Sequence, residues 1–287
     1  MATITAKDVS ELRQRTGAGM MDCKKALEET NGDMDKAVEY LRSKGAAKAE
    51  KRAGRAASEG VVIVALRDDN TAGAMVEVNS ETDFVARNDE FQAAARTLAD
   101  HALETTQASD ANGMLASTMA AQDGQSVEEY VKGVAAKTGE AVSLRKVARF
   151  EAQNGVVGSY VHFNGKIGVL VEVDAADAAS RREELVALAK QLAEHVAAAA
   201  PIGVDKESVP AEVIERERAI FVEQVRAEGK PEAMIDKIVN GKVEAYYKDV
   251  ALTHQVWVRD PKVVVGDLVK KANATVKRFA RFQLGAE

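Results

Sequence analysis

An internal duplication constrains the fold of this chain more strongly than its other features. Three segments of the first half recur about 95 residues later, in the same order and with similar residues. They are Glu59-Gly60-Val61-Val62 with Asn154-Gly155-Val156-Val157, Glu77-Val78-Asn79 with Glu172-Val173-Asp174, and Leu98-Ala99-Asp100-His101 with Leu192-Ala193-Glu194-His195. The repeat predicts two similar α+β subdomains.

Each copy has the pattern of a β-hairpin followed by a helix. In the first copy, the apolar runs 61–66 and 74–78 flank turn residues at 68–73, as expected for two paired strands. A helix is expected over 89–104, where apolar residues recur every three or four positions. In the second copy the turn is Asn164-Gly165, a strong signal for a tight hairpin.

Helical segments flank the duplicated core. The first 45 residues predict three short helices, separated by turn residues at 16–19 and 31–33, with Gly45 ending the third. Later, Gly229-Lys230-Pro231 interrupts a helical pattern and reverses the direction of the chain, which predicts a helical hairpin. We expect the apolar stripe of this hairpin to pack between its two helices. The predicted parts are a three-helix module at 1–45, a basic linker at 46–58, a first core subdomain at 59–153, a second core subdomain at 154–204 and 249–265, a helical hairpin or coiled coil at 205–248, and a C-terminal module at 266–287 with a short helix and a strand-forming run.

Composition and missing motifs argue against several classes of function. The net charge is −6, with 39 Lys and Arg against 45 Asp and Glu, whereas general nucleic-acid binders carry excess positive charge. Apolar runs fall short of the roughly 20 residues of a membrane span, and no signal-peptide pattern is present, so we expect a cytoplasmic protein without membrane contact. The common phosphate-loop, dinucleotide, nucleophile-elbow and zinc-protease motifs are missing. We therefore expect no catalytic residue, metal or cofactor, and no direct nucleic-acid binding.

Several segments allow two interpretations. The stretch 42–55 contains six Lys or Arg and one Glu, which suits a solvated helical linker or a segment that touches RNA on the ribosome. Cys23, the one cysteine, suits a small buried hydrophobic residue or a reactive or intersubunit thiol. His101 and His195 occupy matching places in the repeat, which favours structural roles over ligand binding.

The segment between strand and helix differs between the copies. The first copy has Asn79-Ser80 and then Glu81-Thr82-Asp83-Phe84-Val85-Ala86-Arg87-Asn88, whereas 174–181 in the second copy has no aromatic residue. Loops on a repeated scaffold commonly carry function. Phe84 is therefore either an ordinary core residue or a contact for a partner, and Arg87 is either a partner-facing cation or an ordinary surface residue.

Two long motifs resemble those of one protein family. The segment 12–27, Leu12-Arg13-x-x-Thr16-Gly17-Ala18-Gly19-Met20-Met21-Asp22-Cys23-Lys24-Lys25-Ala26-Leu27, resembles the N-terminal signature of bacterial translation elongation factor Ts. The segment 82–88, Thr82-Asp83-Phe84-Val85-Ala86-Arg87-Asn88, resembles the second signature of that family. The order of modules is also similar, including a UBA-like N-terminal module, and the resemblance covers nearly the whole chain.

The resemblance implies a guanine-nucleotide exchange factor that binds elongation factor Tu. By this resemblance, Asp83 and Phe84 enter the GTPase near its Mg²⁺ and phosphate site, and the rest of 82–88 belongs to the same contact. Leu12, Met20 and Met21 become N-terminal contacts, and His162 becomes a contact from the core. The C-terminal module is a further contact in the family, but Gln255-Val256-Trp257 departs from the usual Gln-Pro-Phe there.

Alternatives to this interpretation stay open. A protein that grips a translation factor without exchanging its nucleotide would have the same motifs. An enzyme built from scattered carboxylates would show a concave pocket with strongly perturbed acids. Met20 and Met21 could instead fill the core of the N-terminal module, although two adjacent helical residues cannot both face a small core well. A homodimer and a two-plus-two complex with the partner also stay open.

Overall fold

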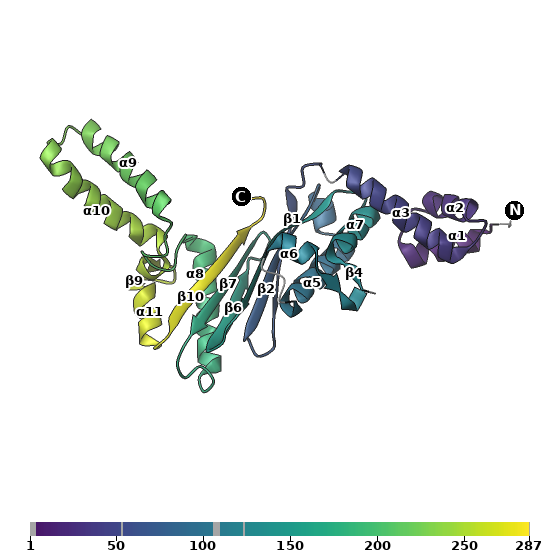
Figure 1. Ribbon diagram of the computed structural model, residues 1–287. Coiled ribbons are helices and arrows are strands. Elements are labelled where there is room, and N and C mark those ends of the chain that lie inside the picture. Colours follow the sequence, from purple (N-terminus) through teal and green to yellow (C-terminus); the bar gives the residue numbers. More distant parts are fainter. Residues whose placement is uncertain (1–3, 53, 106–109, 123, 287) are drawn as a thin grey trace. The chain divides into compact units, whose positions relative to one another are not determined.

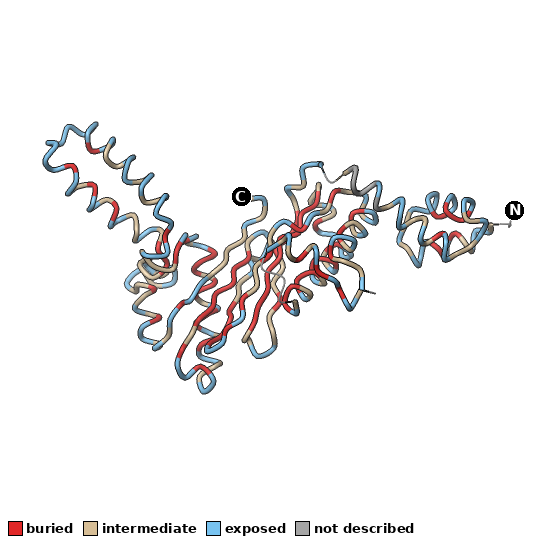
Figure 2. The backbone as a smooth tube through the Cα atoms, viewed as in Figure 1, coloured by how far each residue is buried: buried red, intermediate tan, exposed pale blue. Residues whose placement is uncertain are grey.

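The computed structural model describes residues 4–52, 54–105, 110–122 and 124–286 (Figure 1). The chain forms two compact units, one made of 1–65, 74–149 and 282–287 and the other of 66–73 and 150–281. Helices and strands both contribute to each unit, which confirms the α+β class. Buried positions run along the strands and the inward faces of the helices (Figure 2).

The first unit contains the N-terminal helices and the first copy of the repeat. Its elements are α1 (Ala6–Thr16), α2 (Met20–Glu29), α3 (Met34–Arg52), β1 (Glu59–Leu66), β2 (Ala72–Ser80), α4 (Asp83–Ala86), α5 (Asp89–Glu104), α6 (Ala111–Leu115), β3 (Thr118–Met119), β4 (Gln125–Ser126), α7 (Val127–Thr138) and β5 (Val142–Glu151), with a 3-10 turn at Ala120–Gln122.

The three predicted N-terminal helices are present and share a small core. Thr5 and Asp8 form the capping box that begins α1, and Gly17 ends this helix in the left-handed conformation, with a φ of 68°. The core residues are Val9, Leu12, Cys23, Ala26, Leu27 and Ala37. Cys23 is fully buried, as its interpretation as a small hydrophobic residue requires.

The expected end of the third helix at Gly45 is wrong. The helix α3 continues to Arg52, into the segment expected to be a linker, and packs against α7. A Cβ atom on Gly45 would lie 2.9 Å from the Cβ of Ala136. Gly45 therefore serves the close approach of two helices instead of ending one of them.

The first sheet has the strand order β1-β2-β5. All nine residues of β2, the central strand, are buried. The predicted helix over 89–104 is α5, which buries Phe91 and Leu98 among its inward residues. The segment between β2 and α5 forms the short helix α4 and is described below as part of the candidate site.

The second unit contains the second copy and the helical hairpin. Its elements are β6 (Gly155–Val161), β7 (Ile167–Asp174), α8 (Arg182–Ala199), α9 (Ala211–Ala227), α10 (Glu232–Val250), a 3-10 turn at Leu252–His254, β8 (Val256–Trp257), β9 (Asp260–Val264), α11 (Val265–Lys271) and β10 (Thr275–Gln283).

The second sheet has the order β10-β7-β6. Strands β6 and β7 pair antiparallel around the predicted Asn164-Gly165 turn, and α8 packs against both strands. The expected separate module at 266–287 is therefore corrected: β10 belongs to the core sheet. The side chain of Arg278 on β10 donates from Nε to Glu172 of β7 over 2.6 Å, which fixes this strand to the nearly buried carboxylate.

The recurring glycines explain part of the duplication. A Cβ on Gly60 would lie 2.1 Å from the carbonyl oxygen of Val78, and a Cβ on Gly155 would lie 2.1 Å from that of Val173. Both distances are impossible for real atoms. Each hairpin therefore needs glycine where the start of its first strand lies against the end of its second strand. The two copies thus share a backbone contact as well as a sequence pattern.

The helical hairpin of α9 and α10 has its own apolar core. Val225, Ile235, Val239 and Val243 are buried between the helices, which confirms that the predicted stripe packs internally. Met234, an apolar residue near the start of α10, is about half exposed.

Candidate partner-binding site

Two helix caps define the conformation of the 82–88 segment. The hydroxyl of Thr82 accepts a hydrogen bond from the Val85 N–H and begins α4. The carboxamide oxygen of Asn88 accepts from the N–H groups of Glu90 and Phe91 and begins α5. Because Ser, Thr, Asp and Asn are the preferred N-cap residues, the sequence itself dictates this short turn between two helices.

The capped turn presents Phe84 to solvent. Phe84 is 84% exposed, whereas Ala86 is buried beneath the turn and Val85 is half-buried. The core interpretation of Phe84 is therefore wrong. Ala86, predicted as a contact, instead supports the turn from inside.

Asp83 and Arg87 form an ion pair on the surface of the same turn. Arg87 Nη2 lies 3.0 Å from Asp83 Oδ2, one helical turn away. Such exposed pairs contribute about 0–1 kcal/mol, so a partner can separate them at little cost. The turn thus offers an aromatic ring beside a carboxylate and a guanidinium.

The N-terminal module exposes two methionines at the start of α2. Met20 and Met21 are 56% and 74% exposed, so the alternative in which they fill the core is wrong. Leu12 is fully buried in that core, and its expected role as a partner contact is corrected to support of the module. No hydrogen bond or ion pair among the described residues joins these methionines to the 82–88 segment.

The predicted core contact His162 lies at the tip of the β6–β7 hairpin. Its Nδ1 atom is 2.9 Å from the Tyr160 hydroxyl, and its ring centroid lies 4.5 Å from that of Phe163, with the two rings tilted by 54°. Phe163 is 91% exposed and was not predicted. An aromatic residue directly before an Asn-Gly turn was the signal that could have identified it.

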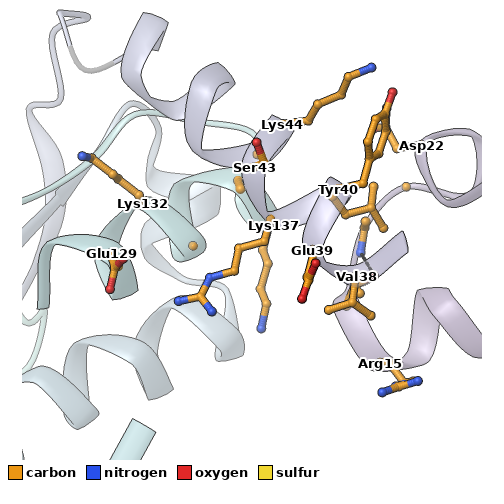
Figure 3. Close-up of a pocket in the computed structure, with 18 of the residues that line it drawn as sticks. Arg15, Asp22, Val38, Glu39, Tyr40, Ser43, Lys44, Glu129, Lys132 and Lys137 are labelled. Atoms are coloured by element: carbon orange, nitrogen blue, oxygen red, sulfur yellow. Dashed lines mark hydrogen bonds between the residues drawn. The ribbon is translucent and has the colours of Figure 1, made fainter. Parts of the chain in front are cut away.

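A cleft of about 760 Å³ lies in the first unit, between the N-terminal helices and α7 (Figure 3). Seven Lys or Arg and three acidic residues line it, among them Lys137 and Glu129. The pKa of Glu129 is lowered because its carboxylate accepts the Ser126 N–H in a helix capping box. This acid has a structural explanation, and its pKa shift gives no support to an enzyme built from scattered carboxylates.

The two repeated histidines hold structural positions. His101 Nε2 lies 2.8 Å from the Ser117 hydroxyl, and His195 Nε2 lies 2.8 Å from Gln255 Oε1. Burial lowers the pKa of both imidazoles. Within the described residues, no three His, Cys, Asp or Glu side chains are grouped closely enough to hold a metal ion. No helix in this part of the chain combines the length and apolar character of a membrane span.

Comparisons with known proteins agree on one family. The family model described as elongation factor TS matches residues 81–286, a range that begins at the capped turn. Curated proteins named elongation factor Ts from Prosthecochloris aestuarii and Chlorobium phaeobacteroides are 45% and 47% identical, each over the whole of both chains. The one from Thioalkalivibrio sulfidiphilus is 48% identical, over 99% of this chain and 92% of the relative.

Proposed function

The chain belongs to the elongation factor Ts family, and from that membership we propose that it is a guanine-nucleotide exchange factor for elongation factor Tu. We further propose that it promotes GDP release by inserting Asp83 and Phe84 near the Mg²⁺ and phosphate site of the GTPase. The observation that carries the proposal is the 84% exposure of Phe84 on a turn fixed by two caps.

The proposed mechanism is mechanical and electrostatic and needs no chemical step by this chain. A GTPase holds its nucleotide largely through Mg²⁺ and backbone amides around the phosphates. Burying a ring such as that of Phe84 in the partner contributes about 1.5–3 kcal/mol, which is gained only if the partner's residues move aside. The carboxylate of Asp83 would disturb polar contacts and cation geometry at the same place.

Exchange also requires that the factor leave again. By linkage, a factor that lowers the affinity of Tu for nucleotide has its own affinity lowered equally by nucleotide. Incoming GTP would therefore expel the factor after GDP has gone, which allows reloading during translation elongation in the cytoplasm.

Other exposed residues would supply the anchoring that one ring cannot. We propose that Met20 and Met21 contact the GTPase from the N-terminal module, with His162 as a further contact from the core. Val85, Arg87 and Asn88 belong to the same contact as Phe84, with Thr82 holding the turn. The same surfaces would contact Tu in a two-plus-two complex, or when a homodimer of this chain binds Tu.

The test is release of fluorescently labelled GDP from purified Tu by the intact chain. Phe84→Ala should slow stimulated release about 10- to 150-fold, the equivalent of the burial energy above, and should leave stability unchanged because the ring is exposed. Val258→Ala removes a half-exposed apolar side chain outside the proposed contacts and serves as a control with normal release. Normal release by Phe84→Ala would refute the insertion.

The alternative of a holding protein predicts a different result in the same assay. It would bind Tu while leaving the rate of GDP release unchanged. Such an outcome with the intact chain would refute exchange as the function while retaining Tu as a partner.

A further inference from the structure

The carboxylate of Glu140 holds the residue on which the Phe84 turn begins. Glu140 follows Gly139, which ends α7 in the left-handed conformation with a φ of 77°. The Thr82 hydroxyl donates to Glu140 Oε1 over 2.7 Å, and the Thr82 N–H donates to Oε2 over 3.0 Å. Both oxygens of the Glu140 carboxylate thus accept hydrogen bonds from a residue that is 58 positions away in the sequence.

These contacts complete the hydrogen bonding of Thr82. Its hydroxyl also accepts from the Val85 N–H over 3.3 Å. Its carbonyl oxygen accepts from the Ser80 hydroxyl over 3.0 Å and from the Ala86 N–H over 3.2 Å. Because each polar group has a partner, Thr82 has one favoured orientation. This orientation also determines the direction in which α4 begins.

A second carboxylate makes the reciprocal contact. Glu81 Oε1 accepts the N–H of Ala141 over 2.7 Å, and Arg55 Nη1 lies 3.3 Å from the same atom. The Ala141 N–H, followed by the charge of Arg55, lowers the pKa of Glu81. Adjacent residues 81–82 and 140–141 therefore hold each other through side chain-to-backbone hydrogen bonds in both directions.

The Glu140 side chain has no other assigned partner among the described residues. Charge-assisted hydrogen bonds of this kind are stronger than neutral ones. The arrangement orients the start of α4 without touching the exposed ring itself.

We propose that Glu140 is a positioning residue for exchange, which acts through Thr82 to hold Phe84 in the orientation that enters the partner. This inference deepens the proposed function and rests on it. Removal of the carboxylate leaves the fold of the sheet intact and allows α4 to reorient or fray.

The first test needs no partner. Amide hydrogen exchange of the free full-length chain should show faster exchange at residues 82–86 in Glu140→Ala, with the strands β2 and β5 unchanged. Glu128→Ala removes a carboxylate on α7 that pairs with Lys132 and is the matched control. Unchanged protection at 82–86 in Glu140→Ala would overturn the proposal.

The second test is a double-mutant cycle in the GDP-release assay. Glu140→Ala should lower the maximal release rate about tenfold, the loss expected for one net hydrogen bond of positioning, with a smaller change in the factor concentration needed for half-maximal rate. In a Phe84→Ala background the same substitution should have little further effect, because the ring it positions is gone. Glu140→Gln, which can still accept the Thr82 N–H, should recover part of the rate.

The outcomes separate this inference from the function on which it rests. A slow Phe84→Ala with a normal Glu140→Ala would refute only the positioning role. Equal losses from Glu140→Ala with and without Phe84 would show a general structural effect and also refute it. A normal Phe84→Ala would refute the insertion itself, and with it the positioning.

Discussion

Acid should destabilise the second unit through His195, because this ring is buried as a neutral tautomer. Gln255 donates from Nε2 to the Asp249 carbonyl oxygen over 2.6 Å, so its Oε1 faces His195 as an acceptor. His195 must therefore carry its hydrogen on Nε2. Its Nδ1 then accepts the N–H of Val258 over 3.3 Å. A second proton, on Nδ1, would face the Val258 N–H, so this hydrogen bond would be lost and the two hydrogens would repel each other.

The sign of the pH dependence follows from the lowered pKa. Burial lowers the pKa of His195 in the folded chain, and the hydrogen bond that His195 donates to Gln255 Oε1 offsets only part of this effect. As pH falls below the usual histidine pKa of about 6.5, the unfolded chain takes up a proton that the folded chain does not. The free energy of unfolding should then fall as the pH decreases, with a slope of at most about 1.4 kcal/mol for each pH unit.

The single tryptophan gives a local readout. Trp257 packs against the same core cluster that contains residues around His195, so its fluorescence follows unfolding of this unit in urea. His195→Gln removes the titrating group and keeps both a donor and an acceptor, so its stability should depend less on pH below 7 and should parallel the parent chain above pH 7.5. Equal pH slopes for the two proteins between pH 7 and pH 5 would refute the reasoning.

Two further predictions concern the repeat and the N-terminal module. Gly155→Ala should lower the free energy of unfolding by about 1–3 kcal/mol or more, because the new Cβ would lie 2.1 Å from a backbone oxygen; urea unfolding followed at Trp257 measures it, and a neutral result would contradict the close contact. Met21→Ser should weaken binding to Tu in titration calorimetry while changing stability by less than about 0.5 kcal/mol, because the side chain is 74% exposed. Unchanged affinity would remove Met21 from the proposed contact.

Local signals made much of the fold predictable. Capping residues, the Asn-Gly turn and the apolar periodicity act between neighbours, so the helix α5 and the turn between β6 and β7 were predicted close to their observed positions. The duplication was visible in part because the same close backbone contact requires glycine at both position 60 and position 155. The end of α3 could not be predicted from Gly45, because a glycine that ends a helix and one that admits a neighbouring helix look the same in sequence.

Long-range partners limited prediction of the site. The role of Glu140 depends on Thr82, and nothing in the polar run after Gly139 indicates which residue it meets. Leu12 was assigned to a contact through its motif, but its helical spacing with Val9 placed it in the core. The exposure of Phe84 was one of two open alternatives, and only the position of α4 above the buried Ala86 decided between them.

The two caps around Phe84 have a consequence for the kinetics of association. A ring on a disordered loop would have to lose backbone freedom at the moment of docking, at about 1–2 kcal/mol for each residue ordered. Here the turn is already ordered in the free chain, so encounter with a partner needs only correct mutual orientation. Loosening either cap should therefore slow productive capture even where every contacting atom is retained.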